Sequence, residues 1–129
     1  MNLFRREELE PIHLPGRKIQ KAVGKDAYSK SAKMTMGFAA YSEEYGSMEP
    51  HQHAEEICYI LSAQDGWMRF GSAPDHLGEK ISLQAGMTMH VPELEWHVFG
   101  YGKGGHVEIV FFYGQVEHIR PEEMEHLKK

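Results

Sequence analysis

The feature that most constrains the fold of this chain is a series of short apolar runs separated by turn residues. Residues 32–41 alternate between two faces, and residues 106–113 form the most apolar run, with large side chains on both faces. A run that is apolar on both faces is typical of a strand in the middle of a sheet. About eight to ten such runs, with turns every eight to twelve residues or so, favour a β-sandwich or a β-barrel.

Turn residues set the expected boundaries between the strands. Residues 17–23 alternate loosely and carry lysines, which would guard the open edge of a sheet. Residues 56–61 are expected to form a strand, and the Asp65-Gly66 pair that follows is a typical hairpin turn. Four glycines within residues 100–105 predict a flexible turn before the last strand.

Two histidine-containing stretches carry the candidate chemistry. His51 and His53 lie two positions apart, and side chains at that spacing in an extended strand point to the same face. Both imidazoles can therefore be directed at one point, and the carboxylate of Glu55 or Glu56 follows within reach. A further histidine, His97, ends the second stretch. Nitrogen and oxygen donors without a thiolate favour a first-row transition metal.

Glycine and proline residues frame the histidines of both stretches. The first stretch contains, in order, Gly46, His51, His53, Glu56 and Gly66. The second contains Gly86, Pro92 and His97. Together they resemble the two conserved motifs of the cupin superfamily, across roughly residues 31–114. The resemblance is to small single-domain, RmlC-like members. It implies an all-β fold, the double-stranded β-helix or jelly-roll barrel, with a metal held by three histidines and one carboxylate.

The pattern offers more than one position for the carboxylate. Glu56 is preferred as the ligand because its distance from the next apolar run matches the family, and because it shares strand parity with Cys58 and Ile60. Glu55 is the alternative, and a centre made of histidines alone is a third. Glu56 is also the candidate catalytic residue, since a carboxylate beside the metal can move a proton.

The implied ligand set, His51, His53, Glu56 and His97, admits several metals. Three imidazoles and a carboxylate leave one or two positions open on Fe, Mn, Ni, Co or Zn. Acceptors for the second imidazole nitrogens are expected among Glu49, Glu55 and Glu108. The candidates for an apolar wall are Trp67, Met36, Phe38, Phe99, Phe111 and Tyr59. The candidates for polar contacts with a ligand are Tyr101, Tyr113, Glu93, Glu95, Arg69 and Gln115.

The chain divides into three parts at this level. Residues 1–30 are expected to form an N-terminal arm, with a short helix at residues 5–10, that packs on the barrel or on a partner subunit. Residues 31–116 form the barrel, and residues 117–129 a C-terminal tail helix. The net charge of −5 is uneven, because residues 1–33 hold eight Lys and Arg against four Asp and Glu. A basic arm can pack against the acidic remainder.

The amino-acid composition limits the kinds of partner that this chain is expected to bind. The acidic body argues against nucleic acid, which is bound by a basic face. No apolar run has the length of a membrane span or of a signal peptide, and one cysteine cannot form an internal disulfide. These features predict a cytoplasmic protein. The cupin resemblance implies a small-molecule ligand or substrate. Resemblance to cupins and the basic arm together predict a homodimer.

Two classes of function remain open. The first is a metal-dependent enzyme that acts on a small polar molecule, with an isomerase of sugars, a dioxygenase, a decarboxylase or a lyase in range. The second is a non-catalytic module that binds or senses a small ligand. The sequence leans towards the enzyme, and it leaves no room for a helix-turn-helix domain after the last strand.

Overall fold

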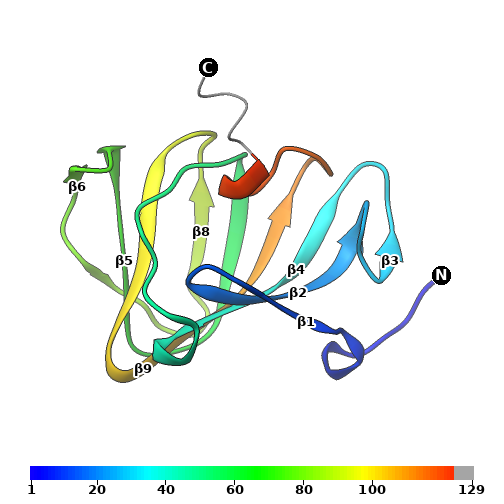
Figure 1. Ribbon diagram of the computed structural model, residues 1–129, viewed down its shortest axis with the longest axis horizontal. Helices are drawn as coiled ribbons and strands as arrows, with labels where there is room; N and C mark the ends of the chain where they lie inside the picture. The colour runs from blue at the N-terminus through cyan, green and yellow to red at the C-terminus, as the bar shows by residue number, and fades with distance from the viewer. Residues whose placement is uncertain (124–129) are drawn as a thin grey trace.

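The computed structural model describes residues 1–123, which are mostly β-structure (Figure 1). Within these residues the strands are β1 (Pro11–Leu14), β2 (Arg17–Gly24), β3 (Ser29–Lys30), β4 (Thr35–Ser42), β5 (Glu56–Ala73), β6 (His76–Leu77), β7 (Ile81–Ser82), β8 (Thr88–Val91) and β9 (Trp96–Tyr113). The helical segments are the short 3-10 turns η1 (Arg6–Glu8), η2 (Glu43–Tyr45) and η3 (Pro121–Glu123). No helix in this part of the chain is long and apolar enough to cross a membrane.

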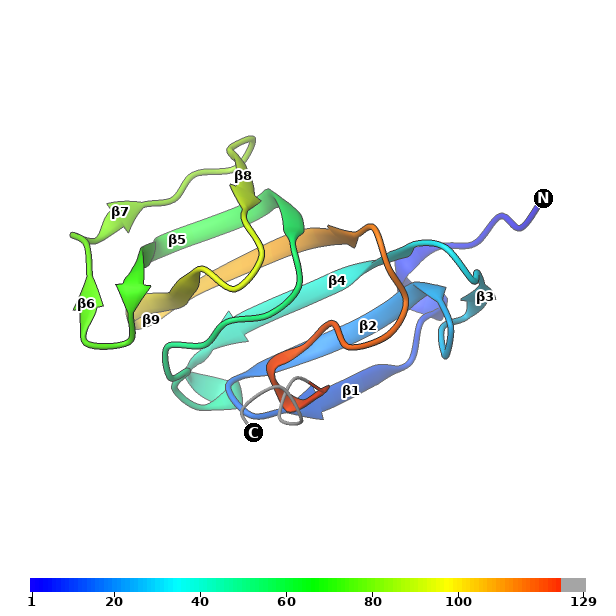
Figure 2. The same ribbon diagram turned by 90° about the horizontal axis from the view of Figure 1, so that it is seen from above.

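The strands form one curled sheet in the order β1-β2-β4-β9-β5-β6, with β3 beside β2 and with β7 and β8 beside β5. The pairs are antiparallel except for β2 with β3. Seen from above, the chain between β4 and β5 and the chain after β9 both lie across the sheet (Figure 2). This architecture confirms the predicted all-β barrel of jelly-roll type.

The Asp65-Gly66 pair is not the predicted hairpin turn, because β5 continues through it as a single strand of 18 residues. The pairing of β5 with β9 shifts register between Gln64 and Gly66, and Asp65 has a φ of 50°. The pair is therefore a bulge at which β5 bends. The opposing backbone leaves room for it, since a Cβ at Gly102 would collide with the Asp65 carboxylate. The predicted flexible turn at residues 100–105 is likewise part of β9.

The predicted edge strand at residues 17–23 forms β2, but it is not at the edge. A turn at Pro15 and Gly16 reverses the chain, so that β1 pairs along the outer side of β2. The predicted helix at residues 5–10 is shorter than expected and forms the single turn η1. The described part of the predicted tail helix contains η3, and residues 124–129 lie outside the described residues.

The hydrophobic core lies inside the curl of the sheet. On β5, Cys58 and Ile60 point inward and are fully buried, whereas Ile57 and Tyr59 between and beside them are exposed. Glu56 shares the inward parity of Cys58 and is also buried. On β4 the inward residues are Thr35, Gly37, Ala39 and Tyr41. The alternation predicted for both strands is thus present, and it brings the carboxyl group of Glu56 into the interior.

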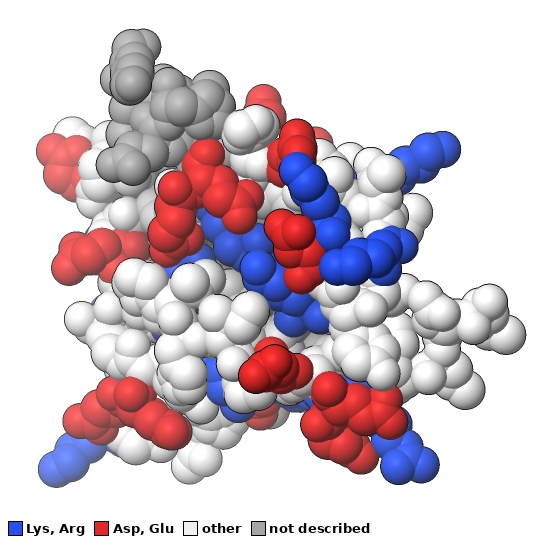
Figure 3. Space-filling model, turned by 45° about the vertical axis from the view of Figure 1, so that its right-hand side comes forward, with Lys and Arg blue, Asp and Glu red and all other residues white. Residues whose placement is uncertain are grey.

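Basic residues from the first 33 positions pair with acidic residues from the rest of the chain. The pairs are Arg6 with Glu108, Arg17 with Glu122, and Lys25 with Glu117. Figure 3 shows Lys and Arg side chains gathered towards the centre of one face, with acidic side chains around them. Exposed pairs of this kind contribute about 0–1 kcal/mol each, so most of their effect is on orientation. The Arg17 pair differs because the Arg17 side chain is buried.

Candidate metal centre

The two histidine-containing stretches are held side by side by backbone hydrogen bonds. The amide of His51 donates to the carbonyl of His97 at 3.0 Å, and the amide of His97 donates back at 2.9 Å. The amide of Leu94 also donates to the carbonyl of His53, at 2.8 Å. Because His51 and His53 are two residues apart on one extended segment, both of their imidazoles face that of His97. The ligand nitrogens of the three histidines lie within 4.8 Å of one another.

Backbone carbonyls fix the tautomer of each of these imidazoles. Each Nδ1 lies within hydrogen-bonding distance of a carbonyl oxygen, which can only accept, so Nδ1 carries the hydrogen. The pairs are His51 with Glu49 at 3.1 Å, His53 with Ala54 at 2.7 Å, and His97 with Glu95 at 2.8 Å. The three Nε2 atoms are therefore left with free lone pairs, which is the form in which imidazole binds a metal.

The spacing of these nitrogens fits a shared metal ion. Nε2 of His53 and Nε2 of His97 lie 3.0 Å apart, although neither carries a hydrogen to place between them. Two nitrogens that each bind one metal at about 2.1 Å, with an angle between 90° and 109°, would be separated by roughly 3.0–3.4 Å. A cation between the two lone pairs turns a repulsive contact into two bonds. The donor set therefore fits a divalent transition metal.

Glu56, and not Glu55, lies beside the three histidines. The Oε1 atom of Glu56 is 3.4 Å from Nε2 of His53, and both side chains are buried. Glu55 points outward on the other face of the strand, where its carboxylate accepts a hydrogen bond from His90 at 2.6 Å. This difference follows from strand parity. Ligation of a metal by Glu56 stays a prediction.

Burial shifts the protonation of the whole cluster. Loss of water and the neighbouring His97 lower the pKa of His51 to about 3 and that of His53 to about 2. Burial also lowers the pKa of His97. For Glu56, burial raises the pKa to about 7, against the opposing effect of hydrogen bonds with Tyr113 and Cys58. At neutral pH the imidazoles are therefore uncharged, as metal ligation requires.

The two neighbouring glutamates give a matched pair of variants. Glu56→Gln is expected to lower the affinity for the metal about tenfold or more, because it removes a buried carboxylate next to His53. Glu55→Gln should leave the affinity unchanged, since that carboxylate points to solvent. Competition of each variant with a chelating dye for Zn²⁺ measures both values. Equal affinities in the wild type and both variants would exclude Glu56 as a ligand.

A cavity of about 20 Å³ adjoins the histidines. Of the six residues predicted for its apolar wall, Phe99 and Phe111 line it. Met36 and Phe38 lie on the outward face of β4, where Arg6 covers the Phe38 ring at 4.7 Å. Of the predicted polar contacts, Tyr113 lines the cavity. The wall also contains Ile19, Ala39, Tyr41, Pro121 and two arginines, Arg17 and Arg120, which the sequence analysis did not select.

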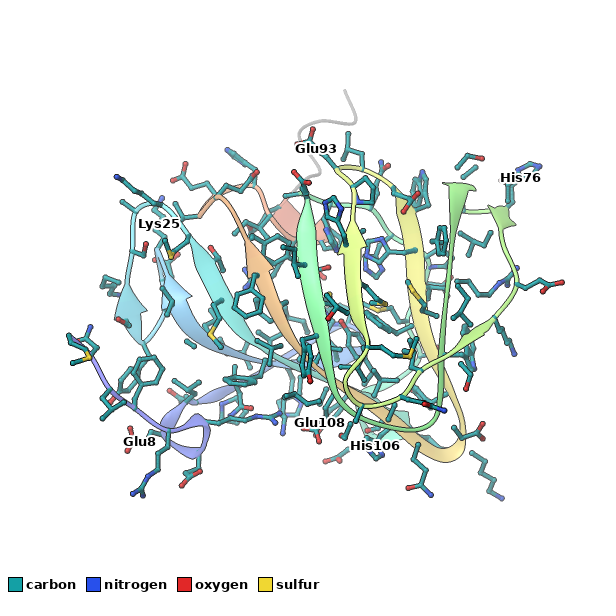
Figure 4. All side chains as sticks on the ribbon, turned by 180° about the vertical axis from the view of Figure 1, so that it is seen from behind. Glu8, Lys25, His76, Glu93, His106 and Glu108 are labelled. Atoms are coloured by element: carbon teal, nitrogen blue, oxygen red, sulfur yellow. The ribbon has the colours of Figure 1, made fainter. Side chains whose placement is uncertain are left out.

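The predicted carboxylate acceptors do not orient the imidazoles. Figure 4 shows Glu108 and His106 at the end of the barrel opposite to Glu93, whereas His53 is bonded to the backbone of Leu94, next to Glu93. Glu108 binds Arg6 and Ser62 instead. Glu49 does accept a hydrogen bond from an imidazole, but through its backbone carbonyl.

The fold is shared with proteins of known structure. No protein-family model matches the chain, and no curated protein matches it in sequence. A protein from Planctomyces limnophilus superposes with a TM-score of 0.70 at 17% identity, over 95% of this chain and 94% of its own. The polyketide cyclase RemF from Streptomyces resistomycificus gives a TM-score of 0.68 at 19% identity, over 100% of this chain and 94% of its own.

A third similar structure is that of oxalate decarboxylase from Bacillus subtilis, a protein with Mn(II) centres. Its TM-score is 0.66 at 20% identity, and the match covers 89% of this chain but 30% of the decarboxylase. These likenesses and the histidine cluster together define a cupin-type fold. The chain is therefore a small β-barrel of the cupin type with a cluster of three histidines, of which His53 and His97 are buried.

Proposed function

We propose that the protein is a metal-dependent enzyme that acts on a small polar molecule. The observation that carries this proposal is the set of three neutral imidazoles whose free Nε2 atoms converge beside a cavity. In the proposal His51, His53 and His97 hold one divalent transition metal, drawn from Fe, Mn, Ni, Co or Zn. The bound metal would supply an open position that polarises a substrate oxygen or accepts O2.

The residues around the centre have separable roles in this proposal. Glu56 either ligates the metal or, from its position beside His53, exchanges a proton with the substrate. Tyr113 shares a hydrogen bond with Glu56 and orients it. Phe99 and Phe111 exclude water from the cavity. Reactions within reach of this arrangement are isomerisation, oxygenation, decarboxylation and elimination.

A second cavity supports a small organic molecule as the ligand. It measures about 360 Å³, adjoins the centre through His97, and is lined mostly by apolar side chains, among them Met68, Leu83 and Met89. This volume lies within the range of about 300–1,000 Å³ that is usual for small-molecule sites. The same cavity also suits the alternative function, a non-catalytic module that binds or senses a ligand.

Elemental analysis separates the two functions at the first step. The protein is purified without a polyhistidine tag, and bound metals are measured beside the His51→Ala variant. One equivalent of metal that is lost in the variant supports the enzyme. Iron would direct assays to oxygen uptake, and Mn, Ni, Co or Zn to isomerase, lyase and decarboxylase assays. A protein that takes up no metal on reconstitution would reject the enzyme in favour of the binding module.

The second part of the proposal is a homodimer. The outer face of β5 and β9 presents a row of exposed apolar side chains, Ile57, Tyr59, Leu61 and Phe112. Ile57 and Phe112 are paired neighbours in the sheet, so the row is continuous across two strands. Apolar rows of this kind are commonly covered in an interface.

Light scattering at micromolar concentration tests the dimer. The wild-type mass is expected to be twice the chain mass of 14.8 kDa. Ile57→Glu, which places a charge in the row beside Phe112, should shift the mass towards the monomer, and Glu79→Lys on a separate loop should not. A monomeric wild-type protein at this concentration contradicts the proposal.

A further inference from the structure

Two buried arginines share the cavity with the three histidines. Arg17 is the first residue of β2 and Arg120 directly precedes η3, so they come from opposite ends of the described chain. Their exposed fractions are 4% and 8%. A guanidinium keeps its charge at any physiological pH, and burial of a charge is costly unless it is paired. Two such groups in one small cavity therefore call for anionic partners.

The contacts of Arg17 show which anion its environment accepts. Its two terminal nitrogens each donate to one carboxylate oxygen of Glu122, both at 3.0 Å. This two-point pairing is the geometry that a guanidinium forms with a planar carboxylate. The group is further held by a hydrogen bond to the carbonyl of Pro15 at 2.9 Å. Arg17 is thus already oriented for a carboxylate at the wall of the cavity.

Arg120 is paired less completely. Among the described residues, its guanidinium makes one hydrogen bond of 3.4 Å to Glu123, lies 5.7 Å from the centre of the Phe111 ring, and is attracted by the buried carboxyl group of Glu56. A guanidinium has five N–H donors, so this arrangement leaves donors for a ligand. Phe111 also lines the cavity, and its ring holds the guanidinium on that side.

The wall of the cavity itself carries more cationic than anionic groups, and the carboxylates of η3 offset that charge. The wall contains two arginines and one carboxyl group, Glu56. The carboxylates of Glu122 and Glu123 approach from η3, whose first residue, Pro121, closes part of the wall. A divalent metal on the histidines would add two positive charges to this wall. With about 20 Å³ of free space, the cavity admits one or two water-sized groups unless η3 moves.

We propose that Arg17 and Arg120 form a subsite for the carboxylate of a small organic acid, and that Glu122 occupies this subsite when no ligand is bound. The inference rests on the proposed function in that it names the substrate class of the same cavity. A substrate carboxylate replaces that of Glu122 on Arg17 and takes the remaining donors of Arg120. The other end of the acid then faces the histidines, and displacement of Glu122 releases η3 from β2.

The test uses acetate as the probe and acetamide as its neutral counterpart. The Nε–H signals of the arginine side chains are followed by NMR in the full chain labelled with ¹⁵N, both metal-free and loaded with Zn²⁺. Acetate is expected to shift the signals of Arg17 and Arg120 in a saturable way, whereas acetamide should not. Zn²⁺ should tighten the binding, because it adds positive charge next to the subsite.

Three variants make the assignment specific. Arg120→Gln is expected to weaken acetate binding about tenfold, because it removes a charged hydrogen-bond donor. Glu122→Gln should tighten it, because acetate no longer competes with an internal carboxylate. Arg5→Gln removes the same charge as Arg120→Gln from an exposed position and should have no effect. Arg17→Gln is informative as well if thermal unfolding shows that it folds.

Several results would overturn the subsite. These are the absence of a saturable response to acetate in both forms of the protein, an equal response to acetamide, or unchanged binding in Arg120→Gln. Acetate binding that requires Zn²⁺ and ignores both arginine variants would assign recognition to the metal alone. The outcome is independent of catalysis, since a metal-free protein that binds acetate retains the subsite even if it takes up no metal and the proposed enzyme fails.

Discussion

The His53→Ala variant is expected to lose the metal while it keeps the fold. Wild-type protein reconstituted with Zn²⁺ should retain about one equivalent after desalting, and the variant less than roughly one-tenth, because a three-nitrogen centre loses one of its donors. His97→Ala should behave in the same way. Both side chains are buried and face each other at 3.0 Å, so neither can be replaced by a neighbouring histidine without movement of the strands.

His90→Ala is the matched control. His90 also lies beside a glutamate, but its side chain is 62% exposed and pairs with Glu55 on the outer surface. This variant should therefore bind one equivalent of metal, as the wild type does. Full occupancy in His51→Ala, His53→Ala and His97→Ala alike would exclude the centre.

Thermal unfolding gives an independent measure of the same interaction. A ligand that binds the folded state at about 100 times its Kd stabilises it by about 2.7 kcal/mol. Zn²⁺ should accordingly raise the Tm of the wild type and of His90→Ala, and leave that of His53→Ala unchanged. Circular dichroism of the metal-free variants shows whether the barrel is intact, as we expect from a core formed by other residues such as Ile60 and Ile109.

The three histidines that the sequence singled out lie close together in the structure, for two different reasons. Alternation along a strand places His51 and His53 on one face, and the second stretch pairs with the first through its backbone. The same rule of alternation separates Glu56, which is buried, from Glu55, which is exposed. Alternation depends on neighbours within a few residues, and the amino-acid pattern contains it directly, whereas the position of His97 was expected from the cupin resemblance.

Features that depend on the shape of the sheet were predicted less well. A positive-φ Asp followed by Gly is compatible with a hairpin turn and with a bulge, and the pairing with β9 decides for the bulge at Asp65. On β4 the larger apolar residues, Met36 and Phe38, face outward, because the inner face has space only for smaller groups next to Phe111. The choice of Met36 and Phe38 for the wall of the site, which followed their size, therefore selected the outer face of β4.

The two arginines of the cavity illustrate a further limit. Arg17 shares parity with Ile19, so a charged residue on the inward face of a predicted strand was a signal that could have been used. Arg120 had no comparable signal, because its position depends on how the chain after β9 crosses the sheet. The amide of Ala54 donates to the carbonyl of Ile119 at 3.1 Å and holds that segment next to the histidines.

Of the two glycine-to-alanine variants described here, Gly37→Ala should lower the free energy of unfolding more. Gly37 faces inward on β4, between β2 and β9. A Cβ at this position would lie 2.5 Å from the carbonyl oxygen of Gln20 and 2.7 Å from Cζ of Phe111. The first of these atoms belongs to the paired backbone and cannot move alone, so overpacking is expected to cost about 2–4 kcal/mol of the free energy of unfolding.

Gly114→Ala provides the comparison, because a Cβ there has nothing within 4 Å. Its free energy of unfolding in urea should stay within about 0.5 kcal/mol of the wild type. The Gly37→Ala, Phe111→Leu double variant should recover part of the loss, since a smaller side chain relieves the second contact while the Gln20 contact remains. Gly37→Ala and Gly114→Ala variants of equal stability would contradict the register of β2 on β4. The same pairing holds β2, which begins at Arg17, alongside β4.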